Sequence, residues 1–302
     1  MLERKKGEKM GIKSRKESLK VFGIFALPGL FAFVAVVIIP FLYGLYLTFT
    51  SWDGISSETN IIGFANYVNV FKDTEFWKSL LLTLKYVVCS VVLVNVVAFF
   101  LGYVLTSKIK GVGFFRTGFF TPNLIGGVVL GFIWQFIFSR VLVSIGTTTG
   151  IDFLSSSFLA DPTKAFWAMV IVTVWQTSGY MMLIYIAGFT GISADVMEAA
   201  SIDGATGFQK LKSVTIPLMM PSFVICIFLT LSRCFMVYDL NLSLTGGEPY
   251  GTTIMSAMHV YNKAFTSRQY GVGQAEALIL FLMVALISGV QIYLGKRKEV
   301  EA

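Results

Sequence analysis

The chain has 302 residues, of which 55% are hydrophobic and 14% are charged, and its mean hydropathy is +0.74. One soluble core needs far fewer apolar residues, so the composition argues against a soluble enzyme and predicts a membrane protein. The net charge of +7 does not indicate nucleic-acid binding, because eight of the 24 Lys and Arg residues precede the first apolar stretch, as in a cytoplasmic flank. We therefore expect membrane lipid, and no nucleic acid, as a partner.

The apolar stretches predict an all-α, polytopic membrane protein with six transmembrane helices. A membrane-spanning helix needs about 20 mostly apolar residues. Such stretches lie at residues 21–50, 79–107, 117–139, 165–193, 217–238 and 277–295. The first is too long for the core of a cleaved signal peptide, so we expect a retained helix. The chain then divides into a basic cytoplasmic tail, residues 1–20, and a transmembrane domain, residues 21–298.

The distribution of Lys and Arg predicts the orientation of these helices. With the N-terminus inside, the inner segments carry sixteen of these residues and the outer loops carry six. Because cytoplasmic segments are enriched in Lys and Arg, both termini are predicted to be cytoplasmic. Lys85 and Arg233 fall inside predicted helices, where a charge costs about 2.5–3.5 kcal/mol on insertion scales. Each must therefore reach the membrane surface or face protein or water.

No residue pattern indicates a metal site or a disulfide framework. The three cysteines lie in apolar stretches without CxxC spacing. His259, the one histidine of the chain, is predicted to be a solvated imidazole in a polar outer loop. We therefore expect no metal ligand and no catalytic residue.

The inner loop at residues 190–216 differs from the other loops. Residues 195–202 contain several good helix formers, Gly204 ends or bends that helix, and a second amphipathic stretch follows at 208–214. Two short helices joined at a glycine have a shape suited to docking into the groove of another protein.

The residues of this loop resemble a family signature. Glu198-Ala199-Ala200 is followed at the family's spacing by Gly204 and by Ile216-Pro217, and this pattern is similar to that of the permeases of binding-protein-dependent ABC importers. The resemblance implies that 190–216 is a cytoplasmic coupling loop of a permease domain and inserts into a partner ATPase. The residues it assigns to ATPase coupling are Glu198, Ala199, Ala200, Asp203, Gly204, Ile216 and Pro217.

A later stretch narrows the resemblance. Thr245, Gly246, Gly247 and Pro249 resemble a pattern of the larger-type subunit in importers of the maltose, glycerol-phosphate and oligosaccharide group, although Glu248 stands where that group usually has a third glycine. The resemblance covers residues 66–298 and implies a multi-pass protein of the inner, or cytoplasmic, membrane. The implied partners are a second homologous permease subunit, two ATP-binding subunits and an extracytoplasmic sugar-binding protein.

The chain contains no P-loop, the glycine-rich phosphate-binding pattern that ends in Lys and Ser or Thr. We therefore expect a transport subunit rather than an enzyme, with no cofactor bound by this chain. ATP and Mg would be used by the partner ATPase.

Two predicted helices carry candidate substrate-binding residues. Gln176 and Tyr180 are one turn apart in the fourth, and the resemblance implies that Tyr180, eighteen residues before Glu198, contacts sugar. In the fifth, a stripe with helical spacing ends just before an aspartate, and the corresponding stretch of similar permeases lines the sugar site. Packing between helices is the alternative role of these polar groups. The candidates are Gln176, Tyr180, Thr230, Arg233, Val237 and Asp239.

The predicted function is that of the permease subunit of an ABC importer. It would translocate a sugar or oligosaccharide that an extracytoplasmic binding protein delivers, and the loop with Glu198 would couple it to a separate ATPase. One alternative is a permease for glycerol phosphate or another small polar solute, which Arg233 would favour. A second alternative, from another class, is an ion-coupled secondary transporter.

Overall fold

The computed structural model describes residues 22–56, 59–107 and 110–297. Within these ranges the secondary structure is helical, apart from one isolated bridge between Thr50 and Ile61, so the all-α prediction is confirmed. The predicted basic tail at residues 1–20, and Lys108 and Lys298 of the charge count, lie outside the described residues.

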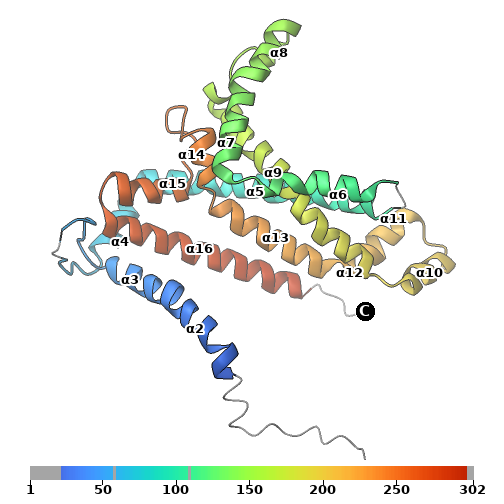
Figure 1. Ribbon diagram of the computed structural model, residues 1–302, viewed down its shortest axis with the longest axis horizontal. Helices are drawn as coiled ribbons and strands as arrows, with labels where there is room; N and C mark the ends of the chain where they lie inside the picture. Colours follow the sequence, from blue (N-terminus) through green and yellow to red (C-terminus); the bar gives the residue numbers. More distant parts are fainter. Residues whose placement is uncertain (1–21, 57–58, 108–109, 298–302) are drawn as a thin grey trace, which may run out of the picture.

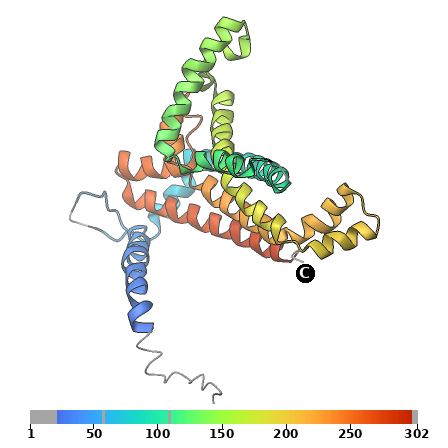
Figure 2. The same ribbon diagram turned by 45° about the vertical axis from the view of Figure 1, so that its right-hand side comes forward.

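The first apolar stretch forms one long helix that is shorter than predicted. It comprises α2 (Leu27–Phe33), the π-helical η1 (Val34–Ile38) and α3 (Ile39–Leu47). Pro28 lies near the start of this helix, where the missing N–H is tolerated. Pro40 lies in its interior, just after the π-helical turn η1, and π-helical turns and prolines are common sites of irregularity in a helix. Figures 1 and 2 show this helix, in blue, leaving the body of the molecule. Nearly all of its side chains are exposed.

Four helices form the body of the molecule, namely α5 (Thr74–Thr106), α9 (Pro162–Gly191), α13 (Met220–Phe235) and α16 (Tyr270–Lys296) (Figure 1). Of the long helices, α9 is the most enclosed. It packs closely on α5, because a Cβ at Gly102 would lie only 3.1 Å from that of Tyr185. The Tyr185 hydroxyl donates a hydrogen bond to Asn95 Oδ1 at 2.8 Å. Small residues and buried hydrogen bonds are typical of packed membrane helices.

The predicted third span at 117–139 is wrong in position. The chain forms α6 (Val112–Phe120) and the 3-10 turn η2 (Thr121–Leu124), and Ile125 and Gly126 are then extended. The apolar helix begins after this break as α7 (Gly127–Phe136), η3 (Ile137–Val141) and α8 (Leu142–Thr149). It leaves the body on the side opposite to α2 and α3 (Figure 2). Arg140, predicted in an outer loop, is an exposed residue of η3.

The predicted fifth span at 217–238 is a bent pair of helices. The inner loop contains α10 (Ala194–Ile202) and α11 (Gly207–Lys210), and η6 (Leu211–Thr215) and α12 (Ile216–Leu218) continue from α11. The segment Gly207–Leu218 meets α13 at a bend of 67°. Pro217 and Pro221 flank this bend, and each lacks the N–H that a continuous helix would need.

Shorter helices complete the described residues at the ends of the bundle. They are α4 (Ala65–Lys72), η4 (Asp152–Leu154), η5 (Phe158–Ala160), α14 (Asp239–Leu244), α15 (Ser256–Tyr261) and η7 (Asn262–Thr266). The described part of the chain has five helices long and apolar enough to cross a membrane, or six if the bent pair is one span. This agrees with the predicted polytopic architecture.

The prediction of a solvated His259 is wrong. The stretch around it folds as α15 and packs on the starts of α5 and α16, so the histidine side chain is only 13% exposed. It faces the carboxylates of Asp73 and Glu276. Hydropathy placed His259 in a loop because the surrounding residues are polar, but several of them are buried in hydrogen-bonded contacts between helices.

Candidate functional site

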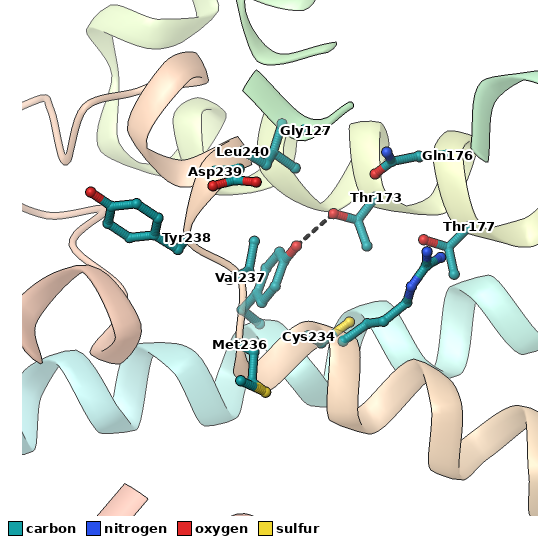
Figure 3. Close-up of a pocket in the computed structure, with 12 residues that line it drawn as sticks. Gly127, Thr173, Gln176, Thr177, Cys234, Met236, Val237, Tyr238, Asp239 and Leu240 are labelled. Atoms are coloured by element: carbon teal, nitrogen blue, oxygen red, sulfur yellow. Dashed lines mark hydrogen bonds between the residues drawn. The ribbon is translucent and has the colours of Figure 1, made fainter. Parts of the chain in front are cut away.

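A polar cavity of about 240 Å³ lies where α13 ends (Figure 3). Five helices contribute to it, namely α5, α7, α9, α13 and α14. The helix α13 ends at Phe235, and the next three residues run non-helically into α14, so their side chains enter the cavity. The lining residues are Tyr86, Gly127, Thr173, Gln176, Thr177, Arg233, Cys234, Met236, Val237, Tyr238, Asp239 and Leu240.

Four of the six predicted substrate-binding residues line this cavity together: Gln176, Arg233, Val237 and Asp239. Tyr180 is not part of the lining, but its ring lies 5.8 Å from the guanidinium carbon of Arg233. Tyr180 can therefore act on the cavity through that side chain.

Thr230 lies outside the cavity. It is fully buried, and its hydroxyl donates a hydrogen bond to the Cys226 carbonyl oxygen at 2.7 Å. The helical stripe correctly groups Arg233 with Val237, but the face that Thr230 occupies, one turn earlier, packs inside the bundle.

Arg233 supplies a positive charge that is oriented from two sides. Its guanidinium donates a hydrogen bond to Asn123 Oδ1 at 2.7 Å, and it lies over the Tyr180 ring. Within the described residues Arg233 forms no ion pair. A guanidinium has five N–H donors, so several of them remain for a ligand. Because the Asp239 carboxylate lies in the same cavity, the site offers both donors and acceptors to a hydroxyl-rich molecule.

Gln176 combines a structural contact with its place in the cavity wall. Its Nε2 donates a hydrogen bond to the Ile125 carbonyl oxygen at 3.0 Å. That carbonyl lies at the break before α7, where a regular helical partner is missing. The side chain therefore fixes the start of α7 against α9. Gln176 thus both packs two helices together and lines the cavity.

The sequence interpretation missed the polar groups opposite Arg233. The hydroxyls of Tyr86 and Thr173 are hydrogen-bonded at 2.5 Å, and this contact, dashed in Figure 3, joins α5 to α9. Thr173 and Thr177 precede Gln176 and Tyr180 at helical spacing, so this spacing could have revealed them. Tyr86 lies on a distant helix, and no local pattern points to it.

Tyr238 lines the cavity from the turn after α13. Partial burial and the neighbouring Tyr261 raise the pKa of the Tyr238 phenol above its ordinary value. A tyrosine hydroxyl is protonated at neutral pH in any case, and here it can donate a hydrogen bond into the cavity.

Lys85, the other charge predicted within a span, lies outside this cavity. Its side chain is exposed, and its Nζ lies 4.7 Å from the centroid of the Phe166 ring. This contact with an aromatic face agrees with the interpretation that Lys85 reaches the surface.

The predicted coupling loop, residues 190–216, contains the two short helices expected from the sequence. Ser193 caps α10, since its Oγ accepts a hydrogen bond from the Val196 N–H. Gly204 follows the helix with φ +77°, a left-handed conformation that suits glycine. The Lys210 ammonium then donates to Ser201 Oγ at 2.6 Å, which ties α11 to α10.

The residues that the sequence assigns to ATPase coupling lie at or near the surface of this loop. Figure 1 shows α10, α11 and α12 at the end of the molecule far from α4 and α15. Four of these assigned residues are exposed, namely Glu198, Ala199, Asp203 and Gly204. The other three, Ala200, Ile216 and Pro217, are partly exposed. The sequence interpretation missed two large apolar side chains on the same surface, Ile202 at 80% and Phe208 at 72% exposure. Two large apolar residues within a predicted surface loop were the signal in the sequence for such a docking surface.

The loop is covalently continuous with the cavity on both sides. The helix α9 carries Gln176 in its middle and ends at Gly191, just before α10. The helix α13 begins after the bend at Met219 and carries Arg233 near its other end. A shift of the loop would therefore move two walls of the cavity.

Long apolar helices around a polar cavity, with an exposed helical loop joined to two of its walls, define a multi-pass membrane transport subunit. Residues 95–300 match the family described as "Binding-protein-dependent transport system inner membrane component". The chain belongs to this family of ABC importer permeases, and it is a multi-pass protein of the cell membrane.

The relatives are similar over nearly their whole length. The chain is 44% identical over 280 residues to the "Probable starch degradation products transport system permease protein AmyD" of Thermoanaerobacterium thermosulfurigenes, covering 93% of this chain and 95% of that protein. It is 35% identical to the "Multiple sugar-binding transport system permease protein MsmF" of Streptococcus mutans, covering 86% and 90% of the two chains.

A solved structure confirms the fold. A chain in the crystal structure of a bacterial ABC transporter "involved in the import of the acidic polysaccharide alginate" superposes with a TM-score of 0.80 at 18% identity. The match covers 93% of this chain and 96% of that chain. At 18% identity, this similarity supports the fold and nothing further.

Proposed function

We propose that this chain translocates a sugar or oligosaccharide that an extracytoplasmic binding protein delivers, with the cavity at the end of α13 as its substrate site. The observation that carries the proposal is the joint placement of Arg233, Asp239 and Gln176 in that cavity. Sugars offer adjacent hydroxyls as donors and acceptors, which such a set can bind. The printed names of the relatives, which concern starch degradation products and multiple sugars, support the same substrate class.

The energy for transport would come from a partner, because the chain has no P-loop. We infer that the coupling loop docks into a separate ATPase, which uses ATP and Mg. Ile202 and Phe208 would enter an apolar groove, and Glu198 would pair with a basic rim. Closure of the ATPase would then move α9 and α13 together and alter the cavity walls.

A second, homologous permease subunit would complete the membrane part. The apolar helices α2–α3 and α7–α8 leave the body on opposite sides, and few of their side chains are buried (Figures 1 and 2). A second permease and lipid would cover these surfaces. The excess of Lys and Arg on the predicted inner side supports cytoplasmic termini.

A permease for glycerol phosphate or another small anionic solute is the second candidate, and it is favoured by one observation. Arg233 forms no ion pair in the described residues and so has donors for a phosphate. A relative named "sn-glycerol-3-phosphate transport system permease protein UgpA", from Agrobacterium fabrum, is 27% identical over 248 residues.

Uptake by the assembled importer in proteoliposomes tests the proposal. Radiolabelled malto-oligosaccharides, maltose and glycerol 3-phosphate are offered separately with ATP inside the vesicles. We expect ATP-dependent uptake of at least one neutral sugar, unchanged by a protonophore. Uptake of glycerol phosphate alone would establish the second candidate, and uptake that requires an ion gradient would contradict the ABC mechanism.

A further inference from the structure

A second cluster of polar side chains lies where the starts of α5 and α16 meet α15, away from the coupling loop (Figure 1). It comprises Asp73, His259 and Glu276, whose potential ligand atoms all lie within 4.8 Å of one another. The expectation that this chain binds no metal depended on a solvated His259. The structure removes that premise.

Glu276 is the unusual member of the cluster. Its side chain has no exposed surface, and neither of its carboxylate oxygens accepts a hydrogen bond in the described part of the chain. The His259 Nε2 atom likewise has no hydrogen bond; it lies 3.5 Å from Glu276 Oε1. Burying a carboxylate without a partner is costly, and native structures rarely do so without an ion, a proton or water at the site.

Asp73 is held in place by its second role as the N-cap of α5. Its Oδ1 accepts hydrogen bonds from the N–H groups of Glu75 and Phe76, at 3.0 and 3.2 Å. The other oxygen, Oδ2, therefore faces the cluster, 3.8 Å from His259 Nε2 and 2.5 Å from Lys263 Nζ. A carboxylate that is already held in one orientation loses little conformational entropy when it binds a metal ion.

We propose that Asp73, His259 and Glu276 bind one divalent transition-metal ion of the zinc class. An imidazole nitrogen with two carboxylate oxygens is a ligand set suited to Zn²⁺ and leaves a fourth position for water. With metal–ligand bonds of about 2.0–2.2 Å, a tetrahedral site separates neighbouring ligand atoms by roughly 3.3–3.6 Å. The two separations from His259 Nε2, 3.5 and 3.8 Å, are close to this range. All three ligand atoms lie within 4.8 Å of one another, so a bound ion would draw the two carboxylates together.

The ion has a route to this site. A cavity of about 610 Å³ opens beside His259, and its walls include Glu75, Lys78 and Asn262. The bound ion would join α5, α15 and α16 and fix the end of the bundle that carries the predicted outer loops. This role is independent of the substrate cavity, so its test does not depend on the proposed function.

Lys263 would compete with a metal ion for the Asp73 carboxylate. Its ammonium pairs with Asp73 Oδ2 but is not within ion-pair distance of Glu276. Without a metal, His259 is the only basic side chain of the described residues within ion-pair distance of the Glu276 carboxylate. With a metal, Lys263, which is 21% exposed, would turn toward solvent. Removing the Lys263 charge should therefore strengthen metal binding.

Metal titration of the full-length chain, purified without a histidine tag and treated with chelator, tests the proposal. We expect wild type to bind Zn²⁺ at about one ion per chain, and Co²⁺ to give visible absorption of a low-symmetry site. Glu276→Gln and His259→Gln should each weaken Zn²⁺ binding by about tenfold or more, while Lys263→Met should strengthen it. Glu75→Gln, which removes a nearby exposed carboxylate outside the ligand set, should leave the affinity unchanged.

Two results would overturn the proposal. One is the absence of stoichiometric Zn²⁺ binding by the folded wild-type chain, and the other is equal affinity in wild type and in whichever of the two glutamine variants folds. Either would mean that these three side chains do not form a metal site.

Discussion

At the scale of single residues, the cavity depends on side chains that are held from outside it. Asn123 and Tyr180 orient Arg233, and the Ile125 carbonyl orients Gln176. A ligand therefore meets donors whose positions are already fixed, which lowers the entropy cost of binding. This arrangement leads to two predictions about individual substitutions.

Replacing Arg233 should weaken transport without affecting insertion. Hydrogen bonds to charged groups contribute about 1.5–3 kcal/mol, so we expect Arg233→Gln to lower the uptake efficiency by roughly 10- to 150-fold. Lys85→Gln is the matched control, because it removes a charge from a long helix but lies outside the cavity. Initial uptake rates in proteoliposomes check this, and equal losses in the two variants would assign Arg233 to general membrane electrostatics.

The hydrogen bond between Tyr86 and Thr173 should stabilise the contact of α5 with α9. Both residues are almost completely buried, so removing either partner leaves the other unsatisfied, at a cost of about 1–3 kcal/mol. We expect Tyr86→Phe and Thr173→Val each to lower the thermal unfolding temperature in detergent. The double variant should lose less than the sum of the two; strict additivity would mean that the two hydroxyls do not act on each other.

At the scale of elements, the shape of the predicted coupling loop depends on the joint between α10 and α11. Gly204 has φ +77°, and a Cβ built there would meet no atom within 4 Å. The constraint on this position is therefore backbone conformation and not space. A β-branched residue would change the backbone and turn α11 away from α10.

Two substitutions of Gly204 distinguish the effect of backbone strain from the effect of side-chain size. We expect Gly204→Val to lower the affinity of the assembled importer for its ATPase, because the left-handed conformation costs about 1–2 kcal/mol for a residue with a side chain. Gly204→Asn should stay near wild type, since asparagine tolerates that conformation. Association is measured by co-purification of the ATPase. Comparable loss in both variants would indicate a requirement for space at the interface instead.

The sequence predicted the elements better than it predicted how they meet. Apolar stretches identified the long helices, but the third was misplaced because apolar residues continue through the break at Ile125 and Gly126. Hydropathy measures composition and does not detect a change of backbone direction. Arg140 was taken for the end of a span, whereas the helix continues through it.

Part of the candidate site was predictable from local patterns. Helical spacing grouped Arg233 with Val237, although Val237 lies just beyond the end of α13, and the motif pointed to the predicted coupling loop. The hydroxyls of Tyr86 and Thr173 meet across helices far apart in the chain, so no local pattern contains that contact. His259 was misread for the same reason, since its acidic neighbours come from two other helices.

At the scale of the whole molecule, α9 and α13 both line the proposed substrate cavity, and the predicted coupling loop joins these two helices. The helices α2–α3 and α7–α8 leave the body on opposite sides and expose apolar surface (Figure 2).

The orientation of the molecule can be tested by labelling. Because the predicted inner side carries sixteen Lys and Arg residues against six outside, we expect a cysteine at Ala205, beside the glycine joint, to react with a membrane-impermeant maleimide only after the cells are opened. A cysteine at Tyr250, which is 89% exposed at the other end, should react in intact cells. The reverse pattern would contradict cytoplasmic termini and the coupling role of the loop.

The most direct test of the account is ATP hydrolysis by the reconstituted importer, stimulated by its sugar-loaded binding protein, with wild type compared with Glu198→Lys. Glu198 is exposed on α10 and lies far along the chain from the cavity residues of α13. Truncating or reversing a charge that a docked interface desolvates costs about 2–5 kcal/mol. We expect Glu198→Lys to insert and to retain a folded substrate cavity, but to lose stimulated ATP hydrolysis. Normal stimulation in this variant would contradict the central claim that the loop transmits ATPase closure to the substrate cavity.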